Sequence, residues 1–349
     1  MKKLYLVTGI SGHLGSTVAS ALLESGQGAV RGFDLPAVRH NNVRGDVEMV
    51  YGDITKPEEL EPAFLHAEDE ELCVIHCAGI VSITSKLNPA IYAVNVTGTK
   101  NVLALCEKYR AAKLVYVSSV HAIPEAPKGT TITEISRFDP KVVEGAYAQT
   151  KAEATQAVLN AAARGLNATV VHPSGIIGPN DLGNGHLTHV IIDFLNSKLT
   201  AIVKGGYDFV DVRDVARGIL AAAERGRAGE CYILSNRYLT VKQLIDTVSE
   251  LTGKKTIKTV LPLWFAQLTA PFAELYYRLR RTAPLYTRYS LYTLESNSQF
   301  SHEKATKELG YRTRDIRETL ADTVAFLKGR GIVKPPRAKR AKKAVKVPS

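Results

Sequence analysis

Residues 8–15 read Thr8-Gly9-Ile10-Ser11-Gly12-His13-Leu14-Gly15, and this stretch decides the fold. It directly follows an apolar run, residues 4–7, and opens a segment with helical spacing, residues 13–25. In such a strand–loop–helix unit the first glycine allows a tight turn and the second lets the backbone approach a pyrophosphate. The third glycine lets the helix pack close to the strand. Because the start of a helix also attracts phosphate, the context predicts a dinucleotide site rather than a plain structural turn.

Outward from this loop, short apolar runs alternate with helically spaced segments. Alternation of this kind predicts an α/β protein, with a doubly wound parallel sheet covered by helices on both faces. The later predicted strands are residues 29–33, 48–51, 72–76, 114–117 and 169–172, and the later predicted helices are residues 57–66, 90–109 and 147–163.

The chain divides into a nucleotide-binding domain and a smaller lobe. We expect the domain over residues 1–172, with its sheet completed by parts of 200–235. Residues 173–327 are expected to form a mostly helical C-terminal substrate lobe interleaved with it, beginning with a loop at 174–184 that is rich in Gly, Pro and Asn. Residues 328–349 hold nine basic residues and no acidic one, so we expect a disordered basic tail.

Composition excludes several classes of protein. The 349 residues are 45% hydrophobic and 23% charged, which is ordinary for a globular chain. The net charge is +11, of which the tail supplies nine charges, so no basic face is spread over the fold. Four cysteines are too few for a disulfide scaffold and form no metal-ligand pattern, which favours free thiols, no metal and a cytoplasmic location. The apolar run after Lys3 stops after four residues, too short for a signal peptide, and no run approaches the about 18 to 20 residues of a membrane span.

Asp34 ends the second predicted strand, 19 residues after Gly15. A carboxylate there can accept both hydroxyls of an adenosine ribose and repel a 2′-phosphate. Since the next residue is Leu35 rather than a basic residue, the sequence favours NAD over NADP; the alternative is a turn aspartate before Pro36. Asp53 follows the third strand and either reaches the adenine amino group or only closes a turn.

Tyr147 and Lys151 form a Tyr-x-x-x-Lys pair that shares one face of a predicted helix. A phenol with its ordinary pKa near ~10 is a poor acid–base group at neutral pH, and a nearby ammonium favours the phenolate. Ser119 ends the fifth predicted strand, where its hydroxyl can orient a substrate oxygen toward Tyr147 or simply cap the strand. These three residues are the candidate catalytic set.

Taken together, these motifs resemble the extended branch of the short-chain dehydrogenase/reductase superfamily over about residues 3–327. The resemblance also rests on Gly52-Asp53, His76-Cys77-Ala78-Gly79, Val94-Asn95-Val96-Thr97-Gly98 and Pro173-Ser174-Gly175-Ile176-Ile177-Gly178-Pro179. It implies a Rossmann fold, bound NAD or NADP, and a Ser/Tyr/Lys set acting on an alcohol or carbonyl. The implied cofactor contacts are Gly9, Ser11, Gly12, His13, Leu14, Gly15, Asp34, Asp53, Ile54, Cys77, Ala78, Gly79, Asn95, Ser118, Tyr147, Lys151, Pro173, Ser174, Gly175 and Ile176. Asn95 is either the structural or proton-relay asparagine of that branch or a residue at a helix N-terminus.

Within the branch, the chain looks most like the 3β-hydroxysteroid dehydrogenase and dihydroflavonol-reductase-like group, because residues 261–289 are similar to its apolar lobe. This implies hydride transfer between a secondary alcohol and a ketone on a lipophilic, sterol- or flavonoid-like substrate. The first alternative is a nucleotide-sugar epimerase or dehydratase, which usually places an Arg where this chain has Tyr207; a phenol cannot make the bidentate ion pair with phosphate. The second is a non-catalytic NAD(P)-binding redox sensor, which typically lacks the Tyr/Lys pair.

Partners are less defined by sequence. A small-molecule substrate is expected, and dimerisation through two helices is common in the superfamily. The basic tail either makes weak contact with a membrane surface or polyanion or stays solvated, and no specific nucleic acid is expected. The aromatic stretch 264–281 either touches a membrane or forms an interior lid helix, and the lid is favoured. For His121, a solvent-facing loop position is favoured over contact with substrate.

Overall fold

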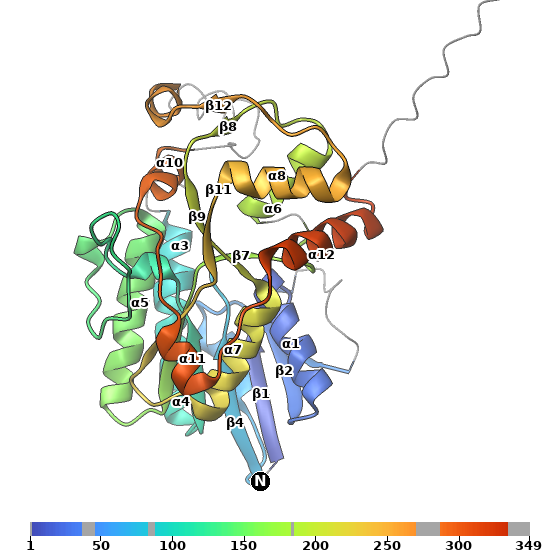
Figure 1. Ribbon diagram of the computed structural model, residues 1–349. Helices are drawn as coiled ribbons and strands as arrows, with labels where there is room; N and C mark the ends of the chain where they lie inside the picture. The colour runs from blue at the N-terminus through green and yellow to red at the C-terminus, as the bar shows by residue number, and fades with distance from the viewer. Residues whose placement is uncertain (1, 37–45, 83–87, 183–184, 270–286, 334–349) are drawn as a thin grey trace, which may run out of the picture.

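A seven-stranded parallel sheet forms the centre of the molecule (Figure 1). The computed structural model describes residues 2–36, 46–82, 88–182, 185–269 and 287–333. The strand order β3-β2-β1-β4-β5-β6-β10, with every neighbouring pair parallel, confirms the predicted Rossmann-type fold. These strands are β1 (Lys2–Thr8), β2 (Ala29–Asp34), β3 (Glu48–Tyr51), β4 (Glu70–His76), β5 (Lys113–Val117), β6 (Ala168–Pro173) and β10 (Cys231–Leu234).

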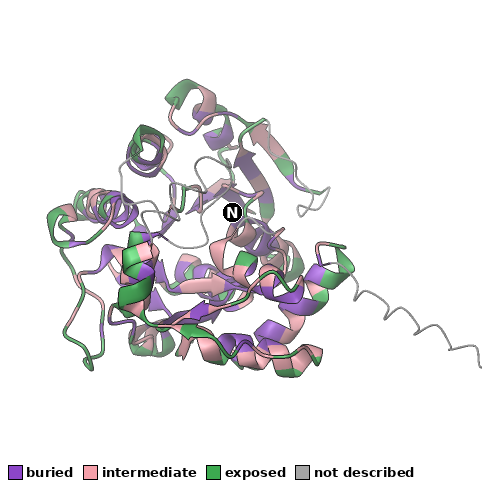
Figure 2. Ribbon diagram, turned by 90° about the horizontal axis from the view of Figure 1, so that it is seen from above, coloured by how far each residue is buried: buried purple, intermediate pink, exposed green. Residues whose placement is uncertain are grey.

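Both faces of the sheet are covered because successive side chains of each strand point to opposite faces. Leu4 and Leu6 pack in the core that α4 (Thr99–Lys108) and α5 (Ala146–Ala163) cover. Tyr5 and Val7 pack in the other core, with α1 (His13–Ser25) and α7 (Val212–Arg225). The strands are therefore continuously apolar, and buried positions line the inner sides of the helices (Figure 2).

Two predicted helices are interrupted. The helix expected over 57–66 is α2 (Pro57–Leu60) followed by a 3-10 turn, η1 (Glu61–Phe64), because Pro62 has no N–H to continue the α-helical bonds. The helix expected over 90–109 consists of α3 (Pro89–Tyr92), a π-helical segment η2 (Ala93–Gly98) and α4.

The second lobe lies beyond the carboxyl ends of the strands (Figure 1). It contains a mixed sheet of β7 (Gly175–Ile177), β9 (Gly206–Asp211) and β11 (Arg237–Thr240), and a pair of β8 (Ile202–Val203) with β12 (Val260–Leu261). The prediction of a loop over residues 174–184 is thus wrong at residues 175–177, because these form β7 and pair with β9. The helices of this lobe are α6 (His186–Leu195), α8 (Val241–Thr252), α10 (Arg288–Glu295) and α12 (Ile316–Gly329), and residues 263–269 are also helical. The remaining helix, α11 (Glu303–Leu309), packs instead beside α7 on the nucleotide-binding domain (Figure 1).

The chain returns from β9 through α7 to β10 in the central sheet, so the two parts are interleaved. The first residues of the expected tail are ordered, because α12 continues to Gly329 and Val333 is buried. Residues 334–349 lie outside the described part of the chain. Within the described ranges, no helix has the length and apolar composition needed to cross a bilayer.

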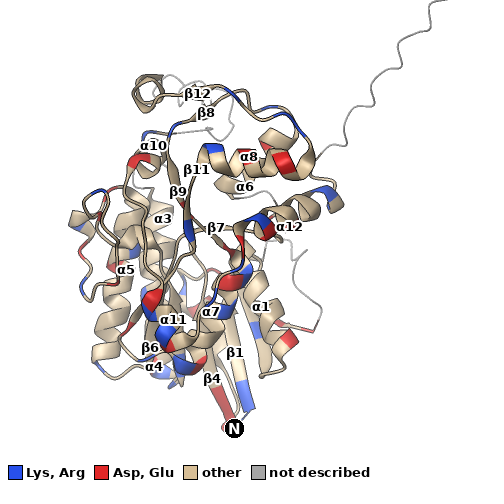
Figure 3. Cartoon of the chain, in the orientation of Figure 1, with Lys and Arg blue, Asp and Glu red and all other residues tan. Residues whose placement is uncertain are grey.

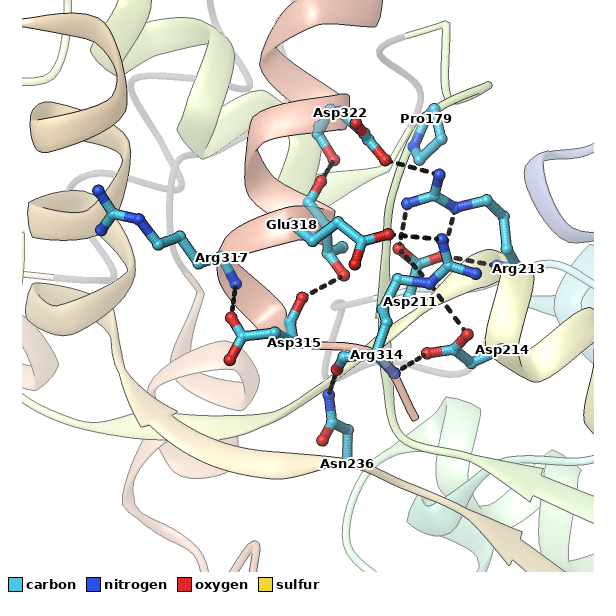
Figure 4. Close-up of polar contacts among 12 residues, drawn as sticks. Pro179, Asp211, Arg213, Asp214, Asn236, Arg314, Asp315, Arg317, Glu318 and Asp322 are labelled. Atoms are coloured by element: carbon cyan, nitrogen blue, oxygen red, sulfur yellow. Dashed lines mark hydrogen bonds and ion pairs between the residues drawn. The ribbon is translucent and has the colours of Figure 1, made fainter. Parts of the chain in front are cut away.

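A buried ion network fixes α12 to the start of α7 (Figure 4). Arg213 donates to Asp211 at 2.7 Å and to Asp322 of α12 at 2.7 Å. Arg314 donates through Nε to Asp214 at 3.0 Å. The carboxylates of Asp211 and Asp214 are fully buried, so their charges depend on these two guanidinium groups and on that of Arg217, which also pairs with Asp214.

Candidate active site

The three glycines of residues 9–15 occupy positions that require glycine for different structural reasons. Gly9 has φ +68°, and a Cβ added there would lie 2.7 Å from the Cα of Ala78. A Cβ on Gly15 would lie 2.1 Å from the carbonyl oxygen of Gly9. A Cβ on Gly12 would meet only that same oxygen, at 3.2 Å. Packing of the chain therefore requires Gly9 and Gly15, whereas Gly12 leaves its approach side open to a ligand.

The N-terminus of α1 is suited to an anion. Its N-cap is Gly12, which supplies no side-chain cap, and its first turn contains no acidic residue. The N-cap residue thus supplies no side-chain acceptor for the N–H groups of the first turn, and a bound anion would accept from them instead. His13 links this loop to the segment after β7, since its Nε2 lies 2.9 Å from the carbonyl oxygen of Pro179. Burial lowers the pKa of His13, so the ring is neutral at neutral pH.

Asp34 lies against the glycine loop at the end of β2. Its carboxylate accepts the N–H of Ser11 at 2.8 Å and that of Leu35 at 2.8 Å. Asp53 accepts both the N–H and the hydroxyl of Thr55, at 2.9 and 2.8 Å, so it closes a turn. Ile54 is buried against Gly98, where an added Cβ would lie 2.8 Å from its Cγ2. The loop, the uncapped helix and Asp34 together fit a dinucleotide.

Ser119, Tyr147 and Lys151 are brought together at the carboxyl end of β5, and all three are buried. Tyr147 and Lys151 lie one turn apart on α5. The Ser119 hydroxyl accepts the N–H of His121 at 3.2 Å, and it lies close enough to the phenol of Tyr147 to lower the pKa of that group. The Lys151 ammonium donates to the carbonyl oxygen of Val117 at 2.9 Å. Ser119 therefore both caps the strand end and contacts the tyrosine.

Burial dominates the protonation of this set. It raises the pKa of Tyr147 to about 12, opposed by the hydrogen bond from Ser119, and lowers the pKa of Lys151 to about 8. The expected effect of Lys151 on the pKa of Tyr147 was tied to a bound nicotinamide ring and stays a prediction. Among the described residues the Lys151 ammonium is engaged by the Val117 carbonyl, and desolvation is the main cause of the raised Tyr147 pKa.

Asn95 lies inside η2 rather than at a helix N-terminus. Its Oδ1 accepts the N–H of Ile80 at 2.8 Å, and its Nδ2 donates to the Ile80 carbonyl and to the hydroxyl of Thr150. Thr150 in turn donates to the carbonyl of Tyr147 at 2.8 Å. An added Cβ on Gly79 would lie 3.3 Å from Asn95 Oδ1 and 3.4 Å from Lys151 Nζ. Asn95 thus joins the segment after β4 to the catalytic helix.

Several expected cofactor residues use their side chains within the protein. The Ser118 hydroxyl bonds that of Thr155 on α5 at 2.6 Å, and Ser174 donates to Asp208. Burial raises the pKa of Cys77 to about 12, so its thiol stays protonated. Cofactor contacts from these residues would therefore come mainly from backbone groups. Pro173 ends β6, and Gly175 and Ile176 begin β7.

The structure adds Tyr289 to the site, brings Tyr207 into it, and corrects the expectation for His121. His121 is not a solvent-facing loop residue: its ring stacks on Tyr207 at 5.4 Å and contacts the Tyr147 ring edge-on at 6.0 Å. Its Nε2 lies 2.9 Å from the Tyr207 hydroxyl and its Nδ1 3.5 Å from that of Tyr289. Burial lowers the pKa of His121 to about 4, so the imidazole is neutral. Tyr289 covers Gly145, where a Cβ would lie 2.2 Å from its ring.

A cavity of about 220 Å³ begins at His121 and Tyr207. Its apolar lining residues come from the segment after β5, the segment before α5 and the C-terminal half of the chain. These residues are Val120, Ile123, Ile132, Val142, Val143 and Phe300. Lys141 is the single basic residue among the described lining residues, and it is accompanied by Glu125 and Glu144. The lining is therefore mixed, since Ser296, Asn297 and Ser298 also belong to it, and its two carboxylates against one lysine do not favour a diphosphate.

Comparison with known proteins agrees with this geometry. The family model described as the NAD dependent epimerase/dehydratase family matches residues 5–235. The Methylococcus capsulatus protein named sterol demethylase protein B is 31% identical over 94% of this chain and 99% of its own length. A Stigmatella aurantiaca protein named 4-hydroxy-2-methyl-3-oxo-4-farnesyl-3,4-dihydroquinoline-1-oxide ketoreductase is 29% identical over 88% of this chain and 91% of its own.

Among solved structures, that of gox2253 superposes with a TM-score of 0.80 at 30% identity, covering 95% of this chain and 99% of the other. The family match covers most of the chain and includes the glycine loop, Asp34, Ser119, Tyr147 and Lys151. The chain therefore belongs to the NAD-dependent epimerase/dehydratase family, within the extended short-chain dehydrogenases/reductases.

Proposed function

We propose that this protein is an NAD-dependent oxidoreductase that interconverts a secondary alcohol and a ketone on a lipophilic, sterol- or flavonoid-like substrate. The observation that carries the proposal is the meeting of Ser119, Tyr147 and Lys151 beside the glycine loop. His121, which contacts the Tyr147 ring, also lines a cavity whose walls are partly apolar. The relatives named for a sterol and for a farnesylated quinoline support a lipophilic substrate.

In this proposal Tyr147 gives a proton to the substrate oxygen in reduction and takes it back in oxidation. The Ser119 hydroxyl holds that oxygen, since it already contacts the phenol. Lys151 holds the cofactor ribose, and its positive charge favours the phenolate when the site is complete. A nicotinamide dinucleotide supplies the hydride acceptor or donor.

The finer assignments rest on individual features. Asp34 favours NAD over NADP, because its carboxylate lies at the ribose end of the glycine loop. All four cysteines are unpaired, which supports a cytoplasmic location. A homodimer and a weak contact of the basic tail with polyanions remain part of the proposal on sequence grounds alone.

The nucleotide-sugar alternative is less well supported. A diphosphate needs cationic partners, and Lys141 is opposed by two carboxylates in the described lining of the cavity. The position expected to hold an Arg is Tyr207, whose ring is buried against His121. A redox sensor without turnover would not need Tyr147 and Lys151 buried side by side.

Tyr147→Phe tests the proposal, because it removes only the acid–base hydroxyl. We expect turnover, followed by NADH absorbance with hydroxysteroids and flavanols, to fall by ~10²- to 10⁴-fold while NAD binding by calorimetry is unchanged. Tyr92→Phe is the matched control, since its hydroxyl bonds Glu153 outside the site. Wild-type rates in Tyr147→Phe would refute the assignment.

A further inference from the structure

An apolar surface patch, made of Val260, Trp264, Phe265 and Leu268, lies at the tip of the second lobe. Trp264 is 66% exposed and Leu268 64%, whereas Val260 and Phe265 are each 40% exposed. Three of the four belong to the helical residues 263–269, the coil beside β12 at the top of Figure 1. The favoured sequence interpretation, an interior lid helix, is therefore wrong for the described residues of this stretch. Large apolar side chains gathered in one exposed patch mark an interaction surface.

Basic residues surround the patch. Residues 251–269 contain three lysines and no acidic residue. Lys255 and Lys258 are exposed on the segment that leads from α8 into β12, where Figure 3 shows basic positions. Lys204 is exposed on the neighbouring strand pair, its N–H bonded to the Leu261 carbonyl at 2.9 Å. One acidic residue, Glu295, lies beside the patch: it accepts a hydrogen bond from Gln267 at 3.2 Å, and its charge faces Lys128 at 3.9 Å.

An apolar groove of about 600 Å³ begins at the patch. Its described lining includes Pro262, Leu263, Trp264 and Leu294. The groove shares residues 296–298 with the cavity beside His121 and Tyr207. The groove and that cavity therefore share one wall, formed by residues 296–298.

We propose that this patch docks the protein on an anionic lipid bilayer. Indole and phenyl rings partition into the interface between headgroups and acyl chains, and lysines around them are attracted to anionic headgroups. Charge complementarity distinguishes this occupant from a second copy of the chain, whose patch would bring the same lysines together. The groove then offers a lipophilic substrate a binding surface beside the bilayer; this role rests on the proposed function, whereas the docking does not.

Trp264 makes the test specific, because it is the only tryptophan in the chain. The full-length protein is mixed with vesicles of phosphatidylcholine, with and without phosphatidylglycerol. We expect its tryptophan emission to shift to the blue and to be quenched by brominated acyl chains only with the anionic vesicles. Vesicle binding without any change in Trp264 emission would mean that another segment, such as the basic tail, binds instead, and would overturn the proposal.

Matched variants distinguish vesicle binding through the patch from non-specific hydrophobic adsorption. Leu268→Ser is expected to weaken vesicle partitioning about tenfold, by analogy with losing one buried aliphatic side chain. Leu65→Ser, at a leucine 55% exposed elsewhere on the surface, is expected to leave it unchanged. Equal partitioning of both variants, or a blue shift that depends on protein concentration without vesicles, would contradict the proposal. Turnover of a water-soluble alcohol by both variants reports on the proposed function separately, because that substrate needs no bilayer.

Discussion

A single substitution at Asp34 tests the preference for NAD over NADP. Asp34→Asn keeps an oxygen that can accept the Ser11 N–H but removes the negative charge. We expect the ratio of kcat/KM for NAD over NADP to fall by about tenfold, since the repulsion of a 2′-phosphate is lost. The measurement is initial rates with both cofactors at fixed substrate. A native enzyme that already prefers NADP would contradict the role given to this carboxylate.

Single residues differ in how well the sequence predicts them. Tyr147, Lys151 and Ser119 could be located because each stands at a fixed place in a strand or helix that local sequence reveals. The burial of His121 could not, because it depends on Tyr207 and Tyr289, which lie 86 and 168 residues away in the chain. No local pattern encodes such contacts.

At the level of elements, the loop between β1 and α1 gives a prediction with its own control. Gly12→Ala meets only one atom at 3.2 Å and has φ −69°, which suits any residue, so we expect a folded protein. The added methyl group obstructs the phosphates, and NAD affinity measured by calorimetry should fall at least about tenfold.

Gly15→Ala instead forces a Cβ to within 2.1 Å of a backbone oxygen, and overpacking of this kind costs about 1–3 kcal/mol of stability or more. A Gly12→Ala protein that binds NAD normally would mean that the dinucleotide does not approach this loop.

Element boundaries show where sequence patterns are insufficient. The strands of the central sheet follow apolar runs closely, because doubly covered strands need little else. The helix predicted over 90–109 was expected to be regular, yet Asn95 lies in a π-helical segment and binds Ile80 and Thr150 across the fold. Such π segments are frequent at functional sites, but their cause is tertiary and is not visible in helical spacing.

At the scale of the whole molecule, the ion network in Figure 4 joins the second lobe to the nucleotide-binding domain. Arg314→Leu leaves Asp214 and Asp211, both fully buried, with fewer cationic partners. We expect a loss of about 3–5 kcal/mol in the free energy of unfolding, measured by urea denaturation. Arg317→Leu removes an exposed pair with Glu250 and should cost at most about 1 kcal/mol. Equal losses for the two variants would show that the network is not a structural link.

Three desolvated histidines, the buried His76 and His172 and the half-buried His121, make stability depend on pH. Burial lowers the pKa of His76 to about 3 and those of His121 and His172 to about 4. Between pH 4 and 6.5 the unfolded chain binds these protons and the folded chain does not, so stability falls as the pH falls. Burial raises the pKa of Asp208 to about 6, which acts in the opposite sense between pH 3.8 and 6. Since three groups oppose one, we expect a lower Tm at pH 5 than at pH 7; a higher Tm at pH 5 would be contrary to these assignments.

The overall division into a nucleotide-binding domain and an interleaved lobe follows from the alternation of strands and helices. The internal sheet of the lobe does not, because β7 and β9 are short strands separated by α6 and β8, and their pairing depends on tertiary contacts.

The central claim is that Ser119, Tyr147 and Lys151 surround the reactive end of a bound nicotinamide dinucleotide. A crystal structure of the protein with NAD⁺ measures this directly. We predict the pyrophosphate against the backbone at Gly12 and the Tyr147 hydroxyl directed at the nicotinamide side of the cleft. A dinucleotide bound elsewhere, or a Tyr147 ring turned away from it, would contradict the account.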